Sequence, residues 1–214
     1  MDIRADLAQP ALVPSPSAWH WVASPQAGVT RVMLDRVGDE VAVATSFVRY
    51  APESSFPGHG HALGEEFIVL EGEFGDEHGR YPPGSYVRNP PGSKHVPFSE
   101  PGCLIWVKLR QFQADDQTQL VAHLDSPIPE NGVQIREIHR FERERVAEVV
   151  LAAGENLALP AVEQPQELLV LEGELQVAGQ RLERWGWLRE PAGQSISLTA
   201  TAPSRLLWKT RPVG

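Results

Sequence analysis

The segment GHGHALGEEFIVLEGE, residues 58–73, decides the fold of this chain. It begins with His59 and His61, whose spacing of two places both imidazoles on one face of a β-strand. Glu65 follows, and then an apolar run that closes on a glycine, which is typical of a buried strand and its turn. A third histidine, His95, comes directly after the turn sequence PPGSK, residues 90–94. Three imidazoles and one carboxylate at this spacing predict a metal site.

Length and patterning predict an all-β protein. A chain of 214 residues can bury a substantial core as one large domain or two small ones. Helical periodicity is scarce, whereas short β-rich runs such as residues 41–48 recur between glycine and proline clusters. The expected architecture is a sandwich or a barrel.

Charge and hydropathy exclude several classes of partner. The net charge is −9 and no segment is rich in lysine or arginine, so we expect no nucleic-acid binding. The same charge favours neutral or aromatic substrates over polyanions. No apolar stretch approaches the roughly 20 residues that span a bilayer, so we expect no membrane insertion and a cytoplasmic location.

Cys103 is the single cysteine, so one chain can form neither an intramolecular disulfide nor a cysteine-based zinc cluster. It precedes the apolar run 104–107. This position favours a buried small hydrophobe over a redox sensor.

The chain repeats itself. Residues 66–73, EFIVLEGE, return 101 residues later as ELLVLEGE, and the same offset aligns residues 88–92 with 189–193. A slightly different offset aligns residues 28–36 with 132–140. Such self-similarity predicts two copies of one fold. The predicted organisation is an N-terminal arm (1–24), a metal-binding domain (25–112), a linker (113–131) and a second domain without metal ligands (132–214).

The second copy acts as an internal control for the candidate site. All four candidate ligands are replaced together: His59 by Pro160, His61 by Val162, Glu65 by Gln166 and His95 by Ile196. The turn residues persist: Gly72 as Gly173, Pro90 as Pro191 and Gly92 as Gly193. We therefore interpret the four ligands as one functional unit. Three basic residues survive in the second copy, which favours a structural role for them: Arg88, Lys108 and Arg110.

The same residues resemble the two motifs of the cupin family, G-x5-H-x-H-x3/4-E-x6-G and G-x5-P-x-G-x2-H-x3-N. Here Glu53 stands at the leading glycine of the first motif and Ser99 at the closing asparagine of the second. The spacing to Gly72 selects Glu65 as the ligand, because Glu66 would point to the opposite strand face. The resemblance implies an all-β bicupin of two tandem cupin (RmlC-like jelly-roll) barrels, one with a metal site and one degenerate.

A narrower resemblance is to the cupin domain of the anti-sigma factor ChrR. It rests on residues 75–82, 86–95 and 102–111. It implies one divalent metal ion, zinc first, with iron, manganese or nickel also compatible. The helical, cysteine-using domain that grips a sigma factor in ChrR does not precede this cupin, so we expect no sigma-factor binding in that manner.

Two functions stay open from the sequence. The first is a small-molecule or oxidant sensing protein that resembles ChrR. The second is a metal-dependent dioxygenase acting on an aromatic or dicarbonyl substrate, similar to the quercetinase-type bicupins. Either function requires a small-molecule ligand, and either a monomeric pseudo-dimer or a homodimer is expected. Four aromatic residues are candidate pocket walls, although core packing is the simpler interpretation: Phe67, Tyr86, Phe98 and Trp106.

Overall fold

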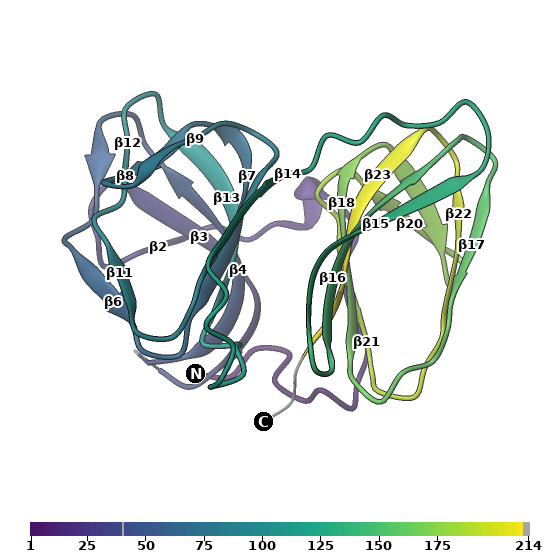
Figure 1. Ribbon diagram of the computed structural model, residues 1–214, viewed down its shortest axis with the longest axis horizontal. Coiled ribbons are helices and arrows are strands. Elements are labelled where there is room, and N and C mark those ends of the chain that lie inside the picture. Colours follow the sequence, from purple (N-terminus) through teal and green to yellow (C-terminus); the bar gives the residue numbers. More distant parts are fainter. Residues whose placement is uncertain (40, 212–214) are drawn as a thin grey trace. The chain divides into compact units, whose positions relative to one another are not determined.

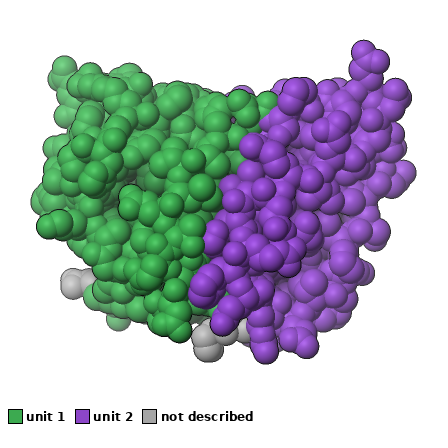
Figure 2. Space-filling model, viewed as in Figure 1, with its two compact units in different colours: residues 1–5, 20–125 green, residues 6–19, 126–214 purple. Residues whose placement is uncertain are grey.

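The computed structural model describes residues 1–39 and 41–211. Within these residues the chain is built from β-strands, which confirms the all-β prediction (Figure 1). It divides into two compact units (Figure 2). The first unit comprises Met1–Ala5 and His20–Asp125, and the second comprises Asp6–Trp19 and Ser126–Gly214.

The first unit is organised around one large antiparallel sheet. In sheet order its described strands are β14 (Leu120–His123), β10 (Ser85–Asn89), β7 (Glu65–Gly72), β13 (Cys103–Leu109), β4 (Val43–Tyr50), β3 (Val29–Val37) and β2 (Val22–Ala23). A smaller sheet contains β5 (Ser54–Ser55), β12 (Phe98–Ser99), β8 (Phe74–Asp76) and β9 (Gly79–Tyr81). A two-stranded sheet joins β11 (Ser93–His95) to β6 (His59–His61).

The second unit repeats this plan without a counterpart of the two-stranded sheet in its described part. In sheet order its large sheet contains β1 (Ala11–Val13), β21 (Trp187–Glu190), β18 (Gln166–Glu172), β23 (Ser204–Thr210), β16 (Glu144–Leu151) and β15 (Val133–Phe141). The smaller sheet contains β17 (Asn156–Leu159), β22 (Ile196–Ala200), β19 (Glu174–Val177) and β20 (Gln180–Glu183).

Strand register shows that the two units are copies of one fold. In the first unit Val107 pairs with Phe67 on one side and with Ser46 on the other. In the second unit Trp208 occupies the same place in the register, 101 residues later, between Leu168 and Ala147. Positions in the two interiors can therefore be compared one by one.

The unit bounds differ from the predicted arm and linker. Residues 6–19 lie in the second unit, where β1 pairs with β21. The predicted linker, residues 113–131, supplies β14, which pairs with β10 of the first unit. β10 and β21 are equivalent strands of the two large sheets. In the first unit this strand pairs with β14, which precedes the second barrel in the sequence, and in the second unit it pairs with β1, which precedes the first barrel. The same sheet edge is therefore covered in both units.

Helical structure in the described residues is limited to the short 3₁₀ turn η1 (Pro16–Ala18). No helix in this part of the chain has the length and apolar character that crossing a bilayer requires.

The turn after β7 depends on a glycine in both units. Gly72 has a φ of 70°, and a Cβ placed on it would lie 1.9 Å from the carbonyl oxygen of Gly102. Its counterpart Gly173 has a φ of 82° and would bring a Cβ to 2.3 Å from the oxygen of Pro203. Gly72 and Gly173 therefore allow a close backbone approach that a side chain would block.

We predict that Gly72→Ala lowers the free energy of unfolding by about 3 kcal/mol, because it adds a backbone clash to the left-handed conformation. Gly92→Ala is the matched control, since Gly92 has a φ of 87° but nothing within 4 Å of an added Cβ. Its expected loss is about 1 kcal/mol. Urea denaturation of both variants measures the difference, and equal losses would contradict this account.

Candidate metal centre

Strands β6 and β11 bring the three predicted histidines together. The two strands pair antiparallel (Figure 1). His95 lies directly opposite His59, and His61 lies two residues further on the same face of β6. The ring centroids are 5.0 Å apart for His59 and His61, 5.1 Å for His59 and His95, and 4.7 Å for His61 and His95.

Glu65, at the start of β7, completes the cluster. Its Oε1 lies 3.6 Å from His61 Nε2 and 3.5 Å from His95 Nε2. One possible ligand atom from each of the four side chains lies within 4.8 Å of the others. His61, Glu65 and His95 are buried, whereas His59 is exposed. The structure thus brings the four predicted residues together, and their role as ligands stays a prediction.

Hydrogen bonds at Nδ1 orient two of the imidazoles. His59 Nδ1 is 3.0 Å from the carbonyl oxygen of Pro57, which can only accept, so this nitrogen carries the proton in the neutral ring. His95 Nδ1 is 3.2 Å from Asp76 Oδ2. Both contacts leave Nε2 as the free lone pair for a metal ion.

Asp76 is the important residue of this site that the sequence interpretation missed. It ends β8, and its Oδ1 accepts hydrogen bonds from the backbone N–H groups of His78 and Gly79 and from the Tyr81 hydroxyl. Burial opposes ionisation of Asp76, but the hydrogen bond from His95 and these other donors outweigh it, so its pKa is lowered. A carboxylate held in this way fixes the tautomer of His95.

The neighbouring groups shift the two buried imidazoles in opposite directions. Burial lowers the pKa of His61, and the nearby His95 and His59 add to this against the opposing charge of Glu65. Burial also disfavours protonated His95, but Asp76 and Glu65 outweigh it and raise its pKa. The lowered pKa favours His61 in the neutral form that metal ligation requires. The raised pKa means that His95 holds its proton more strongly than an ordinary histidine, so a metal ion that binds there has to displace that proton.

The donor set fits a divalent cation. His61 Nε2 is buried and has no hydrogen-bond partner among the described residues. The contact that Glu65 Oε1 receives from Asn89 Nδ2 is long, at 3.4 Å. Buried polar atoms with weak or missing partners are costly, and a cation at the centre of the cluster would satisfy them together. His59, His61, Glu65 and His95 would hold it.

The second unit fills the equivalent space with protein. Gln166 replaces Glu65, and its Nε2 donates to the carbonyl oxygens of Pro160 (3.0 Å) and Gln194 (2.8 Å). Its Oε1 accepts from Trp208 Nε1 at 3.0 Å. Ile196 is 2 % exposed in the hydrophobic core. The amide is fully satisfied without an ion.

A cavity of about 520 Å³ adjoins the four side chains in the first unit. Its walls are mostly apolar and include Val48, Ile105, Val107 and Leu109. The aromatic side chains that line it are Tyr50, Phe56 and Phe74. Its size and its contact with the candidate ligands suit a small organic molecule.

None of the four aromatic residues considered from the sequence lines this cavity. Phe67, Tyr86 and Trp106 are buried, and Phe98 packs beneath the Arg80 guanidinium. Core or surface packing is their observed role. Cys103 is also buried, and burial raises its pKa to about 11. The thiol is therefore protonated and unreactive at neutral pH, as a buried small hydrophobe should be.

The three basic residues interpreted as structural differ in their surroundings. Arg88 is buried and forms ion pairs with Glu66 (3.0 Å) and Asp116 (2.6 Å). Lys108 is buried and donates to the Thr45 hydroxyl at 3.0 Å. These contacts suit a structural role. Arg110 instead borders the cavity.

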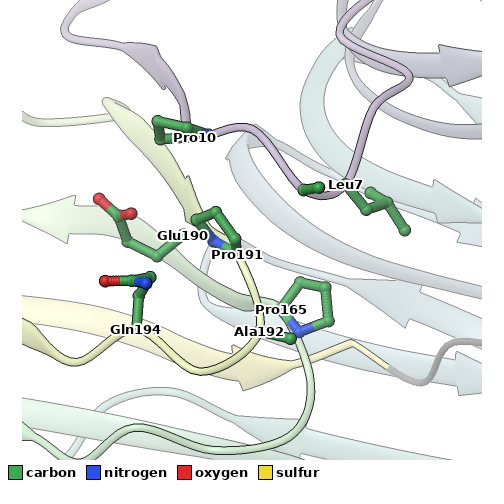
Figure 3. Close-up of a pocket in the computed structure, with 8 residues that line it drawn as sticks. Leu7, Pro10, Pro165, Glu190, Pro191, Ala192 and Gln194 are labelled. Carbon is green, nitrogen blue, oxygen red and sulfur yellow. The ribbon is translucent and has the colours of Figure 1, made fainter.

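The second unit has an open hollow of about 590 Å³ beside residues 7–10 (Figure 3). Figure 3 shows Glu190 and Gln194 next to three prolines of its wall. Glu190 is the one ionisable residue among those lining it, and burial raises its pKa. A single carboxyl group without imidazoles is no metal-ligand set.

Comparison with solved structures places this fold among known barrels. The nickel(II) complex of bacterial pirin YhhW from Escherichia coli is 16% identical, with a TM-score of 0.69 over 96% of this chain and 100% of that one. Protein Ylba from E. coli is 13% identical, with a TM-score of 0.72 over 98% and 94%. Salicylate 1,2-dioxygenase from Pseudoaminobacter salicylatoxidans is 12% identical, with a TM-score of 0.58 over 78% and 68%. These identities establish the fold alone.

The fold and the motif residues define a cupin with two tandem barrels. The sequence model of the ChrR cupin-like domain family matches residues 9–113, so this segment is similar to the ChrR cupin-like domain. A search of curated proteins finds no match.

We predict that Asp76→Asn weakens zinc affinity by about 10- to 100-fold, because His95 loses the carboxylate that orients it and raises its basicity. Competition with a chromophoric chelator measures the affinity. Glu100→Gln is the matched control, since Glu100 is a surface carboxylate paired with Arg80. Equal affinity in the Asp76→Asn variant and the wild type would show that Asp76 does not position a ligand.

Proposed function

We propose that the first unit holds one divalent transition metal ion on His59, His61, Glu65 and His95 and binds a small organic molecule beside it. The observation that carries this proposal is the cavity of about 520 Å³ that borders all four side chains. A metal ion bound there supplies Lewis acidity or, for a redox-active metal, electron transfer with dioxygen. The ChrR likeness favours zinc, and the donor set also suits iron, manganese or nickel.

The ChrR likeness supports a sensing role, in which a small molecule or an oxidant at this site is the signal. Cys103 is buried and its pKa is raised to about 11, so an oxidant would act at the metal centre and not at this thiol. Sigma-factor binding in the ChrR manner is not part of the proposal.

A metal-dependent dioxygenase is the second candidate, and the chemistry of the cavity wall favours it. Tyr50 lines the cavity, and burial, with the nearby Glu65 charge, raises the pKa of its hydroxyl well above the ordinary value. A phenol that stays protonated can donate a hydrogen bond to an oxygen atom of a bound molecule. The apolar walls beside it suit an aromatic body.

We predict that Val107→Phe lowers the affinity of the zinc-loaded protein for 2,4′-dihydroxyacetophenone by about tenfold or more, because the larger ring fills the cavity. Zinc content should stay unchanged. Val121→Phe is the matched control, because Val121 is 57% exposed on β14. Isothermal titration calorimetry measures the binding. Loss of zinc in Val107→Phe, or unchanged affinity for the ketone, would contradict a binding cavity next to the metal.

Oxygen uptake separates the two candidate functions. The dioxygenase predicts that iron(II)-loaded protein consumes one dioxygen per molecule of flavonol or dihydroxyacetophenone, and that His95→Ala abolishes the uptake. The sensing role predicts tightly held metal and no consumption. An oxygen electrode measures this, and zero uptake with all these substrates would eliminate the dioxygenase for this substrate class.

A further inference from the structure

The cavity contains a cationic side chain whose charge is not neutralised. Arg31, on β3, lines the cavity, and its Nε is buried without a hydrogen-bond partner. Among the described residues its guanidinium forms no ion pair, and the charged residue that shifts its pKa is another cation, Arg36. Burial and Arg36 both lower the pKa of Arg31. Arg31 as a whole is half-buried, and its buried Nε donor would be satisfied by a ligand carboxylate in the cavity.

The cavity as a whole is cationic, although the chain carries a net charge of −9. Three arginines line it, and the one carboxylate among its lining residues is the candidate metal ligand Glu65. Arg36 donates to the carbonyl oxygens of Gly38 and Asp39. Arg31 is thus the cavity arginine with a buried, unsatisfied donor.

Comparison with the second unit separates Arg31 from the other two arginines. Arg31 pairs with Val48 across β3 and β4, and its counterpart by register is Ile135, which pairs with Val149. By the same offsets Arg36 and Arg110 become Arg140 and Arg211, so they persist in the barrel that lacks the ligands. Arg31 is lost together with the four candidate ligands.

Register also indicates how a ligand would lie. β3 and β7 are separated by β4 and β13 in the sheet, so their backbones are roughly 14 Å apart along it. Val48 and Ile105 occupy the two strands between Arg31 and β7 in the same row. This row continues to Val69 on β7, four residues from Glu65. Val107 and Leu109 lie on the same face of β13 as Ile105, and Leu109 pairs with Glu65, so the apolar floor reaches Glu65 along β13.

We propose that the cavity takes a small organic carboxylate, with its carboxylate on the Arg31 guanidinium and its apolar body over Val48, Ile105 and Val107 toward the metal ligands. This inference rests on the proposed function and specifies its ligand class. Arginine suits the task because its planar fork binds a carboxylate through two parallel hydrogen bonds. A monoanion matches one unpaired cation.

Benzoate and its neutral isostere benzamide test the proposal in zinc-loaded protein by isothermal titration calorimetry. We expect the wild type to bind benzoate at least about tenfold more tightly than benzamide. Arg31→Ile, which installs the residue of the second unit, should bring benzoate to the affinity of benzamide and leave zinc content unchanged. Arg31→Lys should restore part of the preference. Arg49→Ile is the control, because Arg49 is about half exposed and pairs with Glu71.

Two results would overturn the inference. One is a wild type that does not prefer benzoate, including a wild type that binds neither compound at millimolar concentration. The other is a preference that survives in Arg31→Ile, which would assign the carboxylate to another group. Zinc content, measured on the same samples, tests the proposed function separately. If zinc does not bind, the preference of the metal-free protein for benzoate over benzamide still decides the role of Arg31.

Discussion

Close packing of a barrel interior is the constraint on which the rest of this structure depends. A barrel of this size must fill its inner space with side chains or enclose a ligand. The second unit takes the first solution, because Trp208, Ile196 and Leu159 join one continuous hydrophobic core. The first unit has Val107 where the second has Trp208, and Val107 lines the cavity of about 520 Å³.

The polar groups of the first unit follow from this difference. His61, Glu65 and His95 are buried beside the cavity, and Asp76 holds His95 with its Nε2 toward Glu65. Such a buried set is stable only if its charges and lone pairs are satisfied, and a divalent cation satisfies them together. At another part of the wall the buried Nε of Arg31 lacks a hydrogen-bond partner, and an anionic ligand would satisfy it. Metal and ligand would thus complete the packing that side chains complete in the other barrel.

The sequence predicts the ligand cluster well because strand periodicity is simple. A spacing of two places His59 and His61 on one strand face. Glu65 and Glu66 are adjacent, so they point to opposite faces of β7, and Glu66 forms an ion pair with Arg88. Asp76 and Arg31 were missed, although the second copy has Val177 and Ile135 in their places, so the comparison already contained the signal. Strands β1 and β14 are short and pair through their backbones, so no side-chain pattern marks the sheet that each joins.

Metal content per chain is the measurement that tests the central claim most directly. After incubation with excess zinc and gel filtration, mass spectrometry of the metal should find one ion per chain in the wild type. A variant that carries His61→Val and His95→Ile, the residues of the second unit, should remain folded and hold none. Two ions per chain in the wild type, or one ion retained in the variant, would contradict a single metal centre in the first barrel.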